Sequence, residues 1–426
     1  MTSAIPKPVA SRFRWVVCAL LFAATTIAYI DRGVFGYLKG TLQTIIGWDD
    51  IQYGYISASF KIAYGIGLVT AGWFTDRLGT KKGFAIAIVL WSFAAMSPGI
   101  ASTVFTFGLA MFFLGLGEAA NFPACIKTVA EWFPRKERAL ATGIFNSGAN
   151  VGNMLVPLVV PLLAGLVGWR GAFGVCGATG FVWLAFWLWL YERPEEHPRV
   201  SPGELAYIQS DPAEKIHQVP WLKLLPRKET WAFALGKFLT DPVWWFYTFW
   251  LPGYWQRTFR LDPAGSQMRL SVMLSFGIAI LGSVYGGYIS AALLKRNKTL
   301  NYSRKIALLL CALGVLPIMF VPFSQSLWVT VGLVCLAMAA HQGWSANLFT
   351  VTSDLFPKAA VASVVGIGGM VGAVGGALFD VFVGHVVQWT NSYVPVFAIS
   401  GVSYLLALLI LHGITPKYLP AKLARA

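Results

Sequence analysis

The chain has 426 residues, of which 57% are hydrophobic and only 12% charged, and its formal net charge is +15. A soluble domain carries about 25% charged residues, so this composition excludes an ordinary soluble enzyme or binding module and indicates a membrane protein. The positive charge does not indicate nucleic acid as a partner, because Lys and Arg gather in short segments between apolar runs, as in the cytoplasmic loops of membrane proteins.

Twelve apolar segments follow one another along the chain, and a helix of about 20 apolar residues is enough to cross a bilayer. The longest polar interval, residues 192–230, separates six segments from six and is predicted to be a central loop. We therefore expect an all-α polytopic membrane protein with twelve transmembrane helices in two six-helix bundles, residues 1–191 and 231–426. The segments are approximately 15–38, 51–74, 83–100, 104–129, 139–163, 169–191, 231–255, 271–294, 306–323, 327–352, 361–387 and 392–412.

The distribution of basic residues predicts how the chain sits in the membrane. Both termini, the central loop and the loops after even-numbered segments hold most of the Lys and Arg residues. By the positive-inside rule, both termini and the central loop should lie in the cytoplasm. The five cysteines all fall inside apolar segments, so we expect buried thiols and no disulfide.

The first segment carries Asp31 and Arg32 side by side. A charge at mid-membrane costs at least about 2.5 kcal/mol, so such residues usually have a partner and a function. Arg32 is our candidate for holding a substrate carboxylate, since the guanidinium fork matches a carboxylate, and Tyr29 lies on the same helical face. Asp31 is a candidate proton carrier. The alternatives are a structural ion pair between Asp31 and Arg32, or an Arg32 side chain that reaches the membrane surface.

The second and fourth segments each carry one further charge. Lys61 lies ten residues into the second segment, and Tyr64 shares its face and is a candidate contact for a substrate hydroxyl. Glu118, between small residues of the fourth segment, is the first candidate for proton coupling, because burial disfavours a charged carboxylate and lets it hold a proton. The alternatives are a Lys61 that reaches the membrane surface and a Glu118 that only bridges helices.

The seventh segment combines an ion pair with aromatic side chains. Lys237 and Asp241 stand at i and i+4, so they can pair; we assign Lys237 to substrate binding and Asp241 to proton coupling. Trp244 and Trp245 follow, and indole rings stack on sugars, although either ring could instead be an interfacial anchor. In the tenth segment, Gln342 and Asn347 are candidate contacts for substrate hydroxyls.

Four stretches of sequence resemble a known transporter family. "GWFTDRLGTKK" (72–82) resembles the loop signature of the major facilitator superfamily. Within that superfamily, "YIDR" (29–32) and "EWFPRKERALATGIFNSG" (131–148) resemble the anion:cation symporter family, and "GKFLTDPVWWFYTFWLP" (236–252) is most similar to its hexuronate transporters. The resemblance implies a proton-coupled symporter that imports acidic sugars such as glucuronate or galacturonate by alternating access.

The resemblance also assigns roles that spacing alone does not. Relatives commonly carry an arginine seven residues before the glutamate of the fourth segment, where this chain has Met111, so we hypothesise that Lys61 replaces it as the cation near Glu118. The signature loop is assigned to gating, with four charged residues: Asp76, Arg77, Lys81 and Lys82.

The predicted protein is therefore a monomeric symporter of the bacterial inner membrane that needs no cofactor and binds no nucleic acid. Its partners are a sugar acid, protons and the lipid bilayer. Another organic anion, such as an aldonate, an aldarate or an aromatic carboxylate, stays open as substrate. A membrane enzyme is less favoured because the five histidines are scattered and no nucleophile–base or metal cluster is visible. A channel would require a continuous polar path.

Overall fold

A computed structural model describes residues 11–211, 221–419 and 421, and their side chains except those of residues 72–76, 135, 139, 221, 358, 359 and 362. The described residues form helices and connecting turns. The helices of the first half are α1 (Phe13–Tyr37), α2 (Lys39–Ile46), α3 (Asp50–Leu78), α4 (Thr80–Met96), η1 (Ser97–Gly99), α5 (Val104–Glu118), α6 (Asn121–Trp132) and α7 (Arg135–Leu190). The others are α8 (Pro202–Ile208), α9 (Trp221–Leu224), α10 (Lys228–Phe249), α11 (Leu251–Phe259), α12 (Ser266–Lys295), α13 (Leu300–Val315), η2 (Leu316–Phe323), α14 (Leu327–Leu355), α15 (Lys358–Thr390) and α16 (Val394–Ile414).

The all-α polytopic fold expected from the sequence is confirmed. Nine stretches among the described residues are long and apolar enough to cross a membrane. One of them, in α7, contains two of the predicted spans. Gly168, at φ 75°, interrupts the helix between these two spans and turns the chain. Helices α3 and α10 bring the number to twelve. Both helices fall outside the nine and carry charged residues, which lower the hydropathy of a span: Lys61 of α3 is buried, and Lys237 and Asp241 of α10 are half-buried.

Two predicted spans are interrupted, and proline explains both interruptions. The fourth span, expected over 104–129, is divided into α5 and α6 directly after Glu118. Pro123 lacks an N–H group and cannot bond the carbonyl of Ala119, one turn earlier. The seventh span, expected over 231–255, is divided into α10 and α11 at Trp250, two residues before Pro252. Both breaks adjoin the charged and aromatic residues described below.

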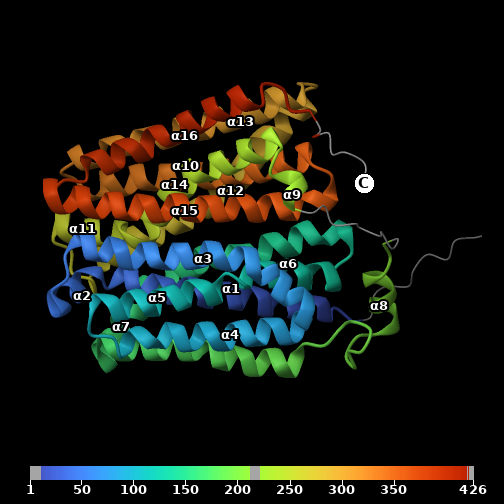
Figure 1. Cartoon of the computed structure of the whole chain (residues 1–426), viewed down its shortest axis with the longest axis horizontal. Helices are drawn as coiled ribbons and strands as arrows, with labels where there is room; N and C mark the ends of the chain where they lie inside the picture. Colours follow the sequence, from blue (N-terminus) through green and yellow to red (C-terminus); the bar gives the residue numbers. More distant parts are fainter. Residues whose placement is uncertain (1–10, 212–220, 420, 422–426) are drawn as a thin grey trace, which may run out of the picture.

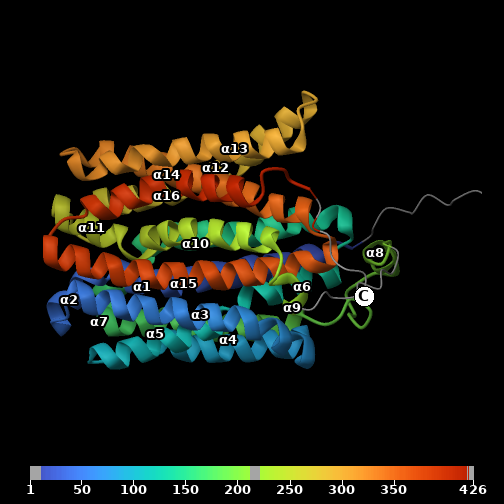
Figure 2. The ribbon, with the colours of Figure 1, turned by 45° about the horizontal axis from the view of Figure 1, so that its top comes forward.

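The two halves of the chain lie side by side. Helices α1–α7 form one half and α10–α16 the other, and they occupy the lower and upper parts of the molecule in Figure 1. In the turned view of Figure 2, α15 of the second half lies at the height of α1. Helix α3 packs against α15, α7 against α12, and α1 against α10. We call the end that holds α2 and α11 the α2/α11 end, and the opposite one, which holds α8 and α9, the α8/α9 end. The exact domain boundaries, at 191 and 231, stay a prediction.

The halves are closely packed toward the α2/α11 end. A Cβ atom added to Gly54 of α3 would lie 2.7 Å from the carbonyl oxygen of Asp380, and one added to Gly384 of α15 would lie 2.6 Å from that of Asp50. Only glycine permits two helix backbones to approach so closely. Hydrogen bonds also cross here: the Tyr53 hydroxyl donates to the Phe249 carbonyl at 2.6 Å. The structure is therefore closed at this end.

Candidate functional site

A buried ion pair between α1 and α5 forms the centre of the candidate site. The Nη2 and Nε atoms of Arg32 lie 2.6 and 2.9 Å from the same oxygen of Glu118, Oε2. The side chains are 2% and 0% exposed. Of the alternatives considered for Arg32, a pair with Asp31 is wrong, and so is an extension to the membrane surface. The cation beside Glu118 is Arg32.

Three atoms of this centre have no hydrogen-bond partner among the described residues. They are Nη1 of Arg32, Oε1 of Glu118 and Oδ1 of Asp31. The other oxygen of Asp31 accepts a hydrogen bond from the indole of Trp91 at 3.2 Å. Buried polar groups are normally satisfied, and unsatisfied ones often mark a place where a ligand or proton binds. The centre thus combines a cationic donor with two carboxylates that can each accept a proton.

Aromatic rings surround the Arg32 guanidinium. Its carbon lies 4.2 Å from the ring centre of Tyr29, 5.3 Å from those of Phe60 and Tyr64, and 5.5 Å from that of Trp245. Tyr29, Tyr64 and Trp245, which we proposed as substrate contacts, therefore lie together beside Arg32. Cation–π contacts fix the guanidinium where water is scarce.

The hypothesis that Lys61 serves as the cation of Glu118 is wrong. Lys61 of α3 forms an ion pair with Asp380 of α15, and the two side chains are 0% and 1% exposed. Lys61 also does not reach the membrane surface. The direction of the Lys61 side chain depends on the rotation of α3 about its axis, which turns the side chain toward the other half. Asp380, which the sequence did not assign, is thereby part of the buried charge cluster.

The predicted ion pair of α10 is confirmed. Nζ of Lys237 lies 2.8 Å from Oδ2 of Asp241. Glycines of α15 make room for this side of the site: a Cβ atom on Gly372 would lie 2.3 Å from Asp241, and one on Gly376 would lie 2.9 Å from the Trp245 ring. The four-residue spacing of Gly372 and Gly376 places both on one face of α15 and lets α10 and α15 approach each other.

The remaining polar candidates are divided between the interface and the packing of one half. The Gln342 amide donates to Oδ1 of Asn150 at 3.3 Å, which joins α14 to α7 across the halves. Trp244 stacks on His341, with ring centres 4.9 Å apart. Asn347, in contrast, donates to the carbonyls of Gly286 and Gly343 at 2.8 and 2.9 Å, so its amide nitrogen is engaged by helix backbones.

The loop residues assigned to gating lie at the α8/α9 end. The side chain of Asp76 lies outside the described residues. Arg77 and Lys82 are exposed, and Lys81 forms an ion pair with Glu192. That pair lies within the first half and the start of the central loop; a role in gating stays a prediction.

A charged cluster at the α2/α11 end is absent from the sequence-based assignments. Asp50 accepts from Lys39 at 2.6 Å and from Arg257 of the other half at 3.0 Å. Its backbone N–H donates to the Gln388 side chain at 3.1 Å. These residues stand at helix ends, where charges are usually solvated, so the sequence offered little signal for a contact between the halves.

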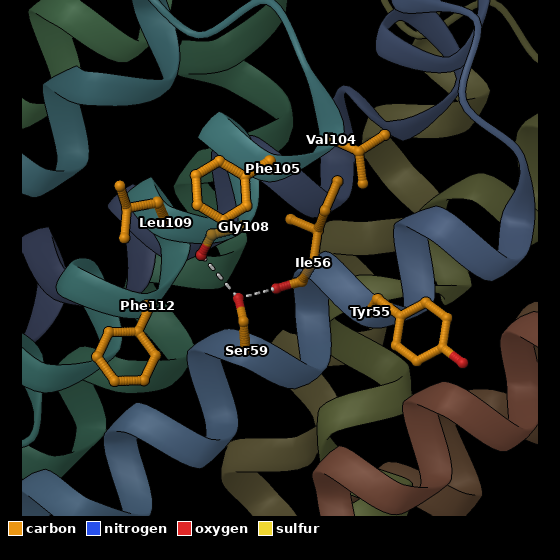
Figure 3. A pocket seen from close by; sticks show the side chains of 8 residues that line it. All are labelled: Tyr55, Ile56, Ser59, Val104, Phe105, Gly108, Leu109 and Phe112. Carbon is orange, nitrogen blue, oxygen red and sulfur yellow. Dashed lines mark hydrogen bonds between the residues drawn. The ribbon is translucent and has the colours of Figure 1, made fainter.

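A groove of about 340 Å³ lies between α3 and α5, as Figure 3 shows. Its lining has no charged side chain, and the Ser59 hydroxyl within it donates to the carbonyls of Ile56 and Gly108 at 2.7 and 2.9 Å. Several of the lining residues are exposed apolar residues, including Tyr55 and Phe105. Such a surface suits lipid contact, so we place the candidate site at the buried charges instead.

Comparison with known proteins places this arrangement in a family. The family model described as "Major Facilitator Superfamily" matches residues 21–379. The chain belongs to the Major Facilitator Superfamily. It is therefore a multi-pass membrane transporter.

Curated relatives of this superfamily member are named for sugar acids. The chain is 31% identical to the hexuronate transporter of Escherichia coli K12, over 93% of each chain. It is 32% identical to the galacturonate transporter of Dickeya chrysanthemi, over 77% of this chain and 95% of the relative. A probable galactarate/D-glucarate transporter of Bacillus subtilis is 28% identical, over 96% and 93%.

Solved structures share the fold. A D-xylose-proton symporter matches with a TM-score of 0.74 and 15% identity, over 96% of this chain and all of that one. A bacterial homologue of the human lysosomal transporter Spinster, in an inward-facing and unoccupied conformation, matches with a TM-score of 0.72 and 17% identity, over 96% and 97%. At these levels of identity, both similarities concern only the fold.

Proposed function

We propose that the protein is a proton-coupled symporter that imports sugar acids, with hexuronates such as glucuronate and galacturonate as substrates. The observation that carries the proposal is the buried Arg32–Glu118 pair, in which one guanidinium nitrogen and one carboxylate oxygen lack partners among the described residues. The names of the relatives support the substrate class.

In the proposed cycle, the substrate and a proton act on the same ion pair. A proton that binds Glu118 removes its charge and weakens its attraction for Arg32. The guanidinium then donates charge-assisted hydrogen bonds to the substrate carboxylate. When the proton leaves, Glu118 recovers Arg32 and the carboxylate is displaced. Asp31, whose free oxygen lies in the same centre, carries a second exchangeable proton.

Other residues of the site hold the sugar itself. Tyr29, Tyr64 and Trp245 offer hydroxyl and ring surfaces next to Arg32. Lys237 and Asp241 line the side contributed by α10, the latter as a further proton acceptor, and Trp244 and Gln342 lie on the second half. The engagement of Asn347 with helix backbones makes it a weaker candidate than we expected.

We further propose that the α8/α9 end faces the cytoplasm of a bacterial inner membrane, as the positive-inside rule indicates. The structure closed at the α2/α11 end then corresponds to a state closed toward the periplasm. Import requires that the halves rock about the central site, so that each end opens in turn. Arg77, Lys81 and Lys82, with Asp76, would then act at the cytoplasmic end, and a monomer would be sufficient for the cycle.

Competition and counterflow in proteoliposomes test the proposal. Unlabelled glucuronate and galacturonate should inhibit uptake of labelled glucuronate, whereas glucose and galactose, which lack the carboxylate, should not. Uptake should be driven by a proton gradient and accelerated by substrate loaded on the other side, as for a carrier. Competition by glucose equal to that by glucuronate would refute the carboxylate site. Stronger inhibition by galactarate or an aromatic acid would redirect the substrate to another organic anion.

A further inference from the structure

The Lys61–Asp380 pair joins the two halves at the level of the central site. Lys61 belongs to α3 and Asp380 to α15, and both side chains are completely or nearly completely buried. Each side chain has a second partner: Nζ of Lys61 also donates to Ser57 at 3.3 Å, and the second oxygen of Asp380 accepts a hydrogen bond from the Trp250 indole at 2.9 Å. Removing one partner from such a pair is strongly destabilising.

The pair adjoins Arg32 through one aromatic ring. Nζ of Lys61 lies 5.6 Å from the ring centre of Trp245, and the Arg32 guanidinium carbon lies 5.5 Å from the same centre. Both cations come from the first half, and each is paired with one internal carboxylate. The difference is that Glu118 lies in the same half as Arg32, whereas Asp380 lies in the other half.

We propose that Asp380 competes with the anionic substrate for Lys61, and that closure of the α2/α11 end decides the competition. This inference rests on the proposed function, since it requires a substrate carboxylate. When the α2/α11 end opens, α15 moves away from α3 and takes Asp380 with it. Lys61 then keeps only Ser57 of its two hydrogen-bond partners, and its charge becomes available to the substrate beside Arg32.

Closure reverses this exchange. The backbones meet at Gly54 and Gly384 only when the halves are together, and that approach returns Asp380 to Lys61. The internal carboxylate replaces the substrate carboxylate, so the substrate is bound more weakly once the outer end is closed. Two other charge pairs lie near this one. Arg32 and Glu118 neutralise each other and stay within the first half. On the side of Trp250, Lys39 lies 4.2 Å from the ring centre and pairs with Asp50, also within the first half. The affinity of the site thus changes with the state of the transporter.

The variant Asp380→Asn tests the competition, because Asn keeps an oxygen for Trp250 but has no charge for Lys61. Isothermal titration of purified full-length protein with glucuronate should give a dissociation constant about fivefold or more below that of wild type, at the lower end of ordinary coupling effects. The double variant Lys61→Met/Asp380→Asn should bind as Lys61→Met does. Asp380→Glu, which restores the charge, should return the affinity toward wild type.

A matched control removes an ion pair that lies within one half. Asp354 pairs with Arg304 at 2.8 Å in the second half, so Asp354→Asn should leave the dissociation constant unchanged. The competition is refuted if Asp380→Asn binds glucuronate with the affinity of wild type. It is also refuted if Asp380→Asn binds glucuronate more weakly than wild type and Asp380→Glu does not restore the affinity. Weaker binding with full recovery in Asp380→Glu would also refute it, because it would make Asp380 a support of the bound state.

A labelling measurement separates failure of this inference from failure of the proposed substrate. Ser57 is completely buried beside Lys61, and the five native cysteines are buried, so Ser57→Cys reports opening between the halves. A maleimide should label Ser57→Cys about fivefold faster in the Asp380→Asn background. If wild type binds no sugar acid, the proposed substrate class is wrong, and equal labelling rates in the two backgrounds would overturn the role of the pair in closure.

Discussion

Glu118→Gln is the substitution that most directly tests the coupling of proton and substrate at Arg32. Glutamine keeps the shape of the protonated acid but has no negative charge. In the closed structure the Arg32 side chain is 2% exposed, and its two hydrogen bonds, at 2.6 and 2.9 Å, are both donated to Oε2 of Glu118. Breaking a buried pair on one side costs about 3–5 kcal/mol, and the ring of Tyr29 at 4.2 Å does not reduce this cost, because that contact is already present in the wild type.

Loss of the negative charge at position 118 should also strengthen the binding of substrate. In the variant, the carboxylate of glucuronate no longer competes with Glu118 for Arg32, so binding should be about tenfold tighter, which corresponds to about 1.4 kcal/mol. The thermal stabilisation of purified protein by glucuronate should therefore exceed that of wild type, while the protein without substrate melts at a lower temperature. Counterflow should persist, and accumulation driven by a proton gradient should be lost.

Two measurements decide whether the reasoning is correct. Glu131→Gln is the control, since Glu131 accepts hydrogen bonds from Thr80 and Tyr191 away from the site, at 2.6 and 2.5 Å. It should accumulate substrate as wild type does. Accumulation by Glu118→Gln equal to wild type would show that its proton is not coupled to transport. Loss of glucuronate binding in a folded Glu118→Gln variant would show that Arg32 needs Glu118 to hold the substrate.

Three further predictions concern other parts of the molecule. Arg32→Lys should weaken glucuronate binding about tenfold in calorimetry, because one charged hydrogen bond is worth about 1.5–3 kcal/mol and an ammonium lacks the fork; equal affinity would contradict this. Gly384→Ala should strongly reduce the initial rate of uptake, because its Cβ would lie 2.6 Å from the Asp50 carbonyl, whereas Gly366→Ala on the same helix meets no atom within 4 Å and should transport normally. Equal rates would show that this close approach is not needed for transport. At the α8/α9 end, burial acts to raise the pKa of Glu204, but hydrogen bonds from Ser11 and the backbone of Arg14 and Phe13 outweigh it and lower the pKa below the ordinary 4.5. Its contribution to stability should therefore be present at pH 7 and be lost as the pH falls through the lowered pKa, so the difference in melting temperature between wild type and Glu204→Gln should shrink below about pH 4; a constant difference would contradict the reasoning.

The sequence by itself determined the class of protein and the local relations within each helix. Length and hydropathy were sufficient to mark the spans, because a bilayer requires about 20 apolar residues for each crossing, but they did not predict the interruptions after Glu118 and at Trp250. The pair Lys237–Asp241 followed from the i, i+4 spacing, since residues on one helix have a fixed geometry. The charged residues inside apolar runs could be selected because a charge within the membrane is costly and therefore rare.

Only the tertiary structure decided which charges meet between helices. The sequence suggested Lys61 as the cation near Glu118, but Arg32 meets Glu118 and Lys61 meets Asp380. Depth follows from the number of residues at 1.5 Å per residue, whereas the direction of a side chain depends on how each helix is rotated and on which helices are neighbours. Those quantities are set by packing over the whole molecule, such as the contact of α3 with α15, between residues more than 300 positions apart. The cluster at Asp50 was missed for the same reason. A charge at the end of a helix is usually solvated, and only the packing of the two halves shows that Arg257 contacts Asp50.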